Sequence, residues 1–194
     1  MMFYVIGRYL GEEPLAISNL IKLLYSFFGA TLIGAIAKAL QVIVSNLIGE
    51  NKQHEVQPTI YKTMFLSLVI GGFLVLILNI FTVEILSLLT GFSSQNQTLI
   101  SKAIPLTRFL GLIIFVYTIS YVFLKGLEGT GATAKAFRFS IISVSVEAVY
   151  ILIFVIYFKA NIFWVWASEI VFWGLLAALC YSYLKSKKWK KVNL

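Results

Sequence analysis

The sequence predicts an all-α protein: a polytopic bundle of transmembrane helices with about five spans and the tail of a sixth. Of its 194 residues, 60% are hydrophobic and only 12% are charged, whereas a soluble domain carries roughly a quarter charged residues. The apolar residues lie in long runs such as Met64 to Val83 and Phe109 to Leu124, and about 20 such residues cross the hydrocarbon core. The runs do not alternate with polar residues, as the strands of a membrane β-barrel do.

Short polar or glycine-containing segments separate the five expected spans. The spans cover residues 15–48, 59–89, 103–124, 136–158 and 162–184, followed by a basic tail at 185–194, and together form a single transmembrane domain over 1–194. Pro14 and Pro105 are expected in first turns, where the missing N–H costs no hydrogen bond, and the second span is expected to begin after Pro58. The first span is longer than the hydrocarbon core requires, so we expect it to tilt, to bend near Gly29 and Gly34, or to project beyond the membrane.

The distribution of basic residues predicts the orientation of the chain. The net charge is +8, and with five spans most lysines and arginines fall on one side: Lys52, Lys62, Lys125, Lys135, Arg138 and the five lysines of the tail. The opposite side holds Arg8, Lys102 and Lys159. This bias predicts a cytoplasmic C-terminus, and we expect a multi-pass protein of the plasma membrane. It also favours contact with anionic lipid headgroups over nucleic-acid binding.

This orientation places the N-terminus outside, which suggests that a preceding helix is missing. The chain is therefore expected to be a fragment, a late-started reading frame or half of something larger.

Four polar residues inside the expected spans are the candidates for a substrate or ion pathway: Lys38, Gln41, Glu147 and Glu169. A charge inside a span costs about a few kcal/mol on insertion scales, so it usually faces a cavity, pairs or carries ions. Residues three and four apart share a helix face. Two such stripes are present: Thr31, Gly34, Lys38, Gln41 and Ser45 in the first span, and Ser140, Ser143, Glu147 and Tyr150 in the fourth.

Alternatives to a pathway remain open at this point. Small and hydroxyl residues also make ordinary helix–helix contacts in membranes, Lys38 could form an ion pair with Glu147, and Glu169 could be a near-interface residue. Enzyme signatures are absent, because the chain has one histidine and no aspartate, and its glycine-rich segment 126–131 lacks the Walker lysine pattern. We therefore expect no catalytic residue, no bound cofactor and no metal site.

Several local motifs resemble the multidrug and toxic compound extrusion (MATE) family, in particular its C-terminal half. Ala39 to Glu50 resembles the end of the second helix of a half, and Met1 to Gly11 resembles the tail of the first helix. Phe123 to Thr133 resembles the family's glycine-rich loop. Trp164 to Glu169 and Lys187 to Trp189 resemble the beginning and the end of the last helix. The chain departs from the pattern at Ala132, where a polar residue is usual, and in its third span, which lacks the acidic residue of some members.

The resemblance implies one lobe of an antiporter built from two six-helix lobes. Such a protein exports cationic, amphipathic compounds in exchange for Na⁺ or H⁺, and Glu147 is the best candidate for a protonatable group. The implied partners are the lipid bilayer, a small-molecule substrate, and the missing N-terminal lobe or a second copy. Two alternatives are a lipid-linked sugar flippase of the wider multidrug/oligosaccharidyl-lipid/polysaccharide flippase superfamily and a non-transporting fragment or accessory subunit.

Overall fold

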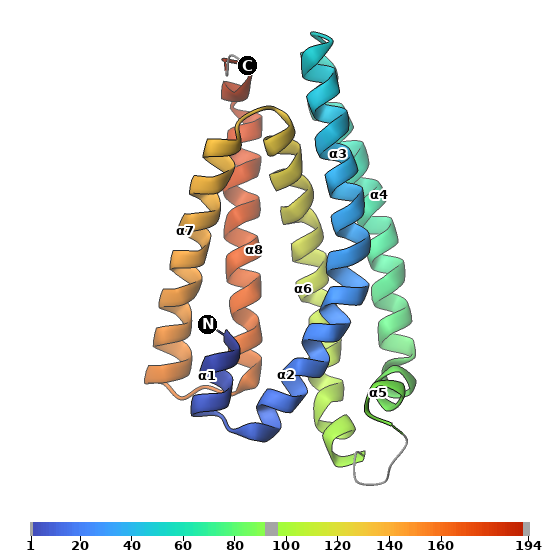
Figure 1. The fold of residues 1–194 in the computed structure, drawn as a ribbon, viewed down its shortest axis with the longest axis vertical. Helices are drawn as coiled ribbons and strands as arrows, with labels where there is room; N and C mark the ends of the chain where they lie inside the picture. The colour runs from blue at the N-terminus through green and yellow to red at the C-terminus, as the bar shows by residue number, and fades with distance from the viewer. Residues whose placement is uncertain (1, 92–96, 192–194) are drawn as a thin grey trace.

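The structure, a computed structural model, describes residues 2–91 and 97–191 (Figure 1). Within these residues every regular element is a helix, which confirms the all-α prediction. Five helical stretches are long and apolar enough to cross a membrane: Glu12–Gly49, Gln53–Ile80, Gln97–Gly129, Thr133–Tyr157 and Ile162–Lys185. The short helix α1 (Met2–Tyr9) precedes them.

The first span contains a π-helical segment in its middle. The span consists of α2 (Glu12–Leu24), the π-helical segment η1 (Tyr25–Thr31) and α3 (Leu32–Gly49). In Figure 1 the oblique α2 leads into a more upright α3. The wider winding of a π-helix is a recognised cause of helix bending. The bend includes Gly29, as expected, but Gly34 lies beyond it in regular α-helix.

The second expected span, 59–89, is not one helix. The chain leaves α4 (Gln53–Ile80) at Phe81 and resumes as α5 (Thr82–Thr90). The Thr82 hydroxyl lies 2.7 Å from the Leu78 carbonyl and 3.1 Å from the Asn79 carbonyl, so it satisfies backbone acceptors at the break. Hydropathy carries no sign of this break, because both helices are apolar.

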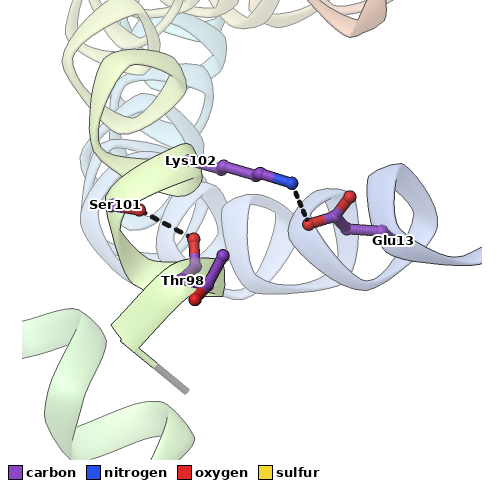
Figure 2. Close-up of polar contacts among 4 residues, drawn as sticks. All are labelled: Glu13, Thr98, Ser101 and Lys102. Carbon is purple, nitrogen blue, oxygen red and sulfur yellow. Dashed lines mark hydrogen bonds and ion pairs between the residues drawn. The ribbon is translucent and has the colours of Figure 1, made fainter. Parts of the chain in front are cut away.

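The third span begins earlier than expected, at Gln97 in α6 (Gln97–Gly129), so that Pro105 lies inside the helix rather than in its first turn. Pro58 likewise lies inside α4. The first turns of α6 make polar contacts (Figure 2). The Lys102 ammonium forms a 2.6 Å ion pair with the Glu13 carboxylate of α2, and within α6 Ser101 donates a 2.8 Å hydrogen bond to the Thr98 carbonyl. These polar contacts lie at one end of the bundle.

Helix α6 is central to the bundle, since it packs on α3, α4 and α8 (Ile162–Lys185). Helix α7 (Thr133–Ile151), continued by η3 (Leu152–Tyr157), packs on α8. The α3–α4 turn, the α6–α7 turn and the described C-terminal end share one end of the molecule, and the α1–α2 and α7–α8 turns lie at the other (Figure 1). Large apolar side chains such as Phe65, Phe73 and Phe137 are more than 60% exposed, as a lipid-facing surface requires.

Candidate functional site: a carboxylate pair between the last two spans

Glu147 of α7 is held by the neighbouring helix α8. Its Oε1 atom accepts a 3.2 Å hydrogen bond from the buried hydroxyl of Ser168. Glu147 belongs to the polar stripe of Ser140, Ser143, Glu147 and Tyr150, and its hydrogen bond with Ser168 places it toward α8. Glu147 also lines a cavity of about 210 Å³ together with Met2 of α1 and Val144. The carboxylate is thus both fixed by a neighbour and adjacent to open space.

Glu169 follows Ser168 directly on α8 and is the second carboxylate of the site. Its Oε2 atom accepts a 2.9 Å hydrogen bond from the Trp173 indole, one helical turn further along. Glu147 and Glu169 lie close enough to repel each other electrostatically. Two half-buried carboxylates that repel each other are unfavourable while both are charged, so a cation or a proton at either of them would stabilise the pair.

An aromatic cluster borders Glu169 on the side facing the centre of the bundle. Tyr117 of α6 lies with its ring centroid 4.8 Å from that of Trp173, 5.5 Å from that of Tyr25 of η1 and 5.2 Å from that of Tyr121. The Tyr25 hydroxyl is fully enclosed and within electrostatic reach of Glu169. Ring faces attract cations, so the cluster and the carboxylate together form surroundings suited to a positively charged group.

The aromatic cluster was not among the candidates predicted from the sequence. Two signals for it exist: Tyr117 and Tyr121 are four residues apart in one span, and so are Glu169 and Trp173 in another, which places each pair on one helix face. Nothing in the sequence indicates that the two faces meet. Tyr25, which lies in the π-helical segment, offers no spacing signal at all.

The structure places Lys38 and Gln41 away from the carboxylate pair. The hypothesis of an ion pair between Lys38 and Glu147 is wrong. The ion pairs found in the described part of the chain do not involve Lys38, which is exposed on α3. Glu147 faces Ser168 instead. Gln41 is half-buried, and its backbone oxygen lies beside Gly129 of α6. A pathway role for these four candidates stays a prediction.

The stripe of α3 that carries Lys38 contributes in part to helix packing. Gly34 lies against Tyr117 and Tyr121, and the Ser45 hydroxyl donates a 3.1 Å hydrogen bond to the Gly129 carbonyl. Small and hydroxyl residues at a membrane helix contact are expected to behave in this way. Part of the stripe therefore has the ordinary packing role that the sequence left open.

Five apolar helices of spanning length, with two half-buried glutamates on the last two of them, define a polytopic membrane protein with a polar site within its spanning segments, a feature of proteins that move solutes or ions. The MatE family model matches residues 1–153, so the chain belongs to the MatE family, whose members are transporters. This confirms the family that the local motifs resemble. No curated protein and no solved structure matches the chain significantly. Glu147 lies within the matched range, and Glu169 lies beyond it.

The described residues do not bring three or more histidine, cysteine, aspartate or glutamate side chains together in a group that could hold a metal ion. The oxygen atoms at this site that could contact a cation include those of the two carboxylates, which accept hydrogen bonds here, and that of the Ser168 hydroxyl.

Proposed function

We propose that this chain is the C-terminal lobe of a MATE-type antiporter that exports cationic, amphipathic compounds in exchange for Na⁺ or H⁺. The observation that supports the proposal is the placement of two half-buried glutamates, Glu147 and Glu169, on the neighbouring helices α7 and α8, each held by a hydrogen bond from α8. The proposed setting is the plasma membrane, with the C-terminus in the cytoplasm. The lobe is proposed to work with an N-terminal lobe or with a second copy.

The pair provides a physical basis for exchange. Its negative charge attracts both the coupling ion and the positive group of a substrate, and the rings of Tyr117 and Trp173 next to Glu169 add attraction for an organic cation. Because both ligands need the same charge, binding of one opposes binding of the other. Each ligand therefore shifts the equilibrium between the conformations of the lobe toward the conformation that it binds more tightly.

The proposal is tested by efflux of ethidium from cells that express the chain, compared with cells that carry the empty vector. Glu147→Gln and Glu169→Gln are each expected to lower efflux roughly tenfold, because a contact with a charged group contributes about 1.5–3 kcal/mol. Glu84→Gln is the matched control, since Glu84 is an exposed residue in the first turn of α5. Equal efflux in all three variants, with equal amounts of protein in the membrane, contradicts the assignment of the carboxylate pair.

Lys38 favours a second candidate function, flipping of a lipid-linked sugar. It is an exposed lysine within a spanning helix, and in the described ranges no carboxylate pairs with it. A cation there suits an anionic diphosphate linker better than it suits a cationic drug. In that case Lys38→Gln abolishes flipping of a lipid-linked oligosaccharide in proteoliposomes, and ethidium is not transported by the unaltered chain.

A further inference from the structure

A second site lies far from the carboxylate pair, at the end of the bundle that carries the C-terminal tail. There a cavity of about 400 Å³ opens between α7 and α8. Lys135 and Phe139 of α7, Ser182 and Tyr183 of α8, and Lys188 of the 3₁₀ turn η4 (Lys188–Lys191) line it. The cavity therefore combines two cationic groups with an aromatic wall.

The two lysines of this cavity have no anionic partner within the ranges that the structure describes. The ion pairs found there are Lys52–Glu50, His54–Glu55, Lys102–Glu13 and Lys125–Glu128. Lys135 and Lys188 are both exposed and face one cavity from two different elements. Two lysines that line one cavity without a carboxylate partner in these ranges attract an anion.

Part of the wall of the cavity is apolar. The Phe139 and Tyr183 rings pack edge to face with centroids 6.0 Å apart, and Leu179 extends the wall along α8. These helices are spanning helices, so their ends lie at the level of lipid headgroups. An anion at the lysines that also carries an acyl chain would match both parts of the cavity.

Buried contacts fix the position of Lys188, so it does not move freely with a loose tail. Trp189 is 1% exposed, and its indole donates a 3.1 Å hydrogen bond to the Leu184 carbonyl. Gln57 of α4 donates to the same carbonyl at 2.7 Å. The Ser186 hydroxyl oxygen accepts a 3.4 Å hydrogen bond from the Lys188 amide. The turn that carries Lys188 is thereby held against the bundle.

We propose that this cavity binds one anionic phospholipid, with its phosphate between Lys135 and Lys188 and an acyl chain along Phe139 and Leu179. Basic pockets between membrane helices recognise acidic headgroups. Two lysines without carboxylate partners give a preference for a headgroup with net negative charge over a zwitterionic one. The site is independent of the transported substrate and of the carboxylate pair.

The test is native mass spectrometry of the purified full chain with phosphatidylglycerol or phosphatidylcholine of the same acyl composition. One phosphatidylglycerol is expected to stay bound, with weaker binding of phosphatidylcholine. Inorganic phosphate in millimolar excess is expected not to displace the lipid. Equal binding of the two lipids overturns the proposal, and displacement by phosphate overturns it in favour of a free-anion site.

Two variants locate the lipid. Each lysine near an anionic headgroup contributes roughly a five-fold factor in affinity, so K135Q/K188Q is expected to weaken phosphatidylglycerol binding roughly 25-fold. K185Q/K187Q is the matched control, because it removes the same amount of charge from the same end of the bundle but from outside the cavity. Leu179→Trp narrows the cavity beside the proposed acyl chain without changing charge and is expected to weaken binding of the lipid. An equal loss in K135Q/K188Q and K185Q/K187Q, or full retention in Leu179→Trp, contradicts the site.

Discussion

Ser168 and Glu147 connect the last two spanning helices through a hydrogen bond of 3.2 Å from hydroxyl to carboxylate. Ser168 directly precedes Glu169 in the sequence, so the residue next to one glutamate positions the other, Glu147. Under the proposed function, ion binding at Glu147 would act directly on this contact between α7 and α8. This relationship is the basis of the first prediction.

Removal of the Ser168 hydroxyl is expected to shift the ion dependence of efflux. A hydrogen bond to a charged group contributes about 1.5–3 kcal/mol and favours the charged carboxylate, so Ser168→Ala is expected to lower the H⁺ concentration needed for half-maximal efflux roughly tenfold if H⁺ is the coupling ion. Ser182→Ala is the control, because the Ser182 hydroxyl bonds to the Ala178 carbonyl of its own helix. An ion dependence that is the same in both variants contradicts a role for Ser168.

The indole of Trp173 is expected to position Glu169. Trp173→Phe keeps an aromatic ring against Tyr117 but removes the donor of the 2.9 Å hydrogen bond to Glu169. We expect ethidium efflux to fall several-fold in this variant. Trp164→Phe changes a tryptophan that stacks on Phe154 away from the site, and its efflux is expected to match that of the unaltered chain. If the two variants lose equal activity, the effect is not specific to Glu169.

Gly129 is expected to be required for the close crossing of α3 and α6. A Cβ atom at this position would lie 2.7 Å from the Gln41 backbone oxygen and 2.8 Å from the Val44 Cβ. Gly129→Ala is therefore expected to destabilise the bundle by roughly 1–3 kcal/mol, seen as a lower Tm in detergent. Gly72→Ala meets no atom within 4 Å, and its Tm is expected to be unchanged or higher, since alanine favours helix. Equal Tm values would contradict close packing at Gly129.

The proposed orientation is tested by labelling single cysteines with a membrane-impermeant maleimide. Cys180 is buried, so the background is expected to be low. Lys159→Cys lies in the α7–α8 turn and is expected to react in intact cells, whereas Lys52→Cys, in the α3–α4 turn, is expected to react only after permeabilisation. The opposite result would place the C-terminus outside.

The number and approximate place of the spans are predictable from the sequence because lipid exposure demands long apolar runs. The break at Phe81 is not predictable, since the hydrogen bonds of Thr82 that accompany it leave hydropathy unchanged. The π-helical segment at Tyr25–Thr31 is only partly foreseeable, through Gly29. A π-helix depends on packing against neighbouring helices as well as on composition.

The carboxylates of the site can be found from the sequence, but their surroundings cannot. Glu147 and Glu169 stand out because charges inside apolar runs are rare. Their mutual proximity, and the choice of Ser168 rather than Lys38 as the partner of Glu147, depend on how α7 and α8 pack. Spacing along one helix identifies a face but does not identify the helix that the face meets.

The most direct test of the proposed antiport is ethidium transport by the full chain in proteoliposomes under an imposed Na⁺ or H⁺ gradient. We expect one of the two gradients to drive ethidium across the membrane, with transport collapsing when the gradient is dissipated and when E147Q/E169Q replaces the unaltered chain. Ethidium movement that is independent of both gradients, or equal in E147Q/E169Q and the unaltered chain, would contradict coupling through the carboxylate pair.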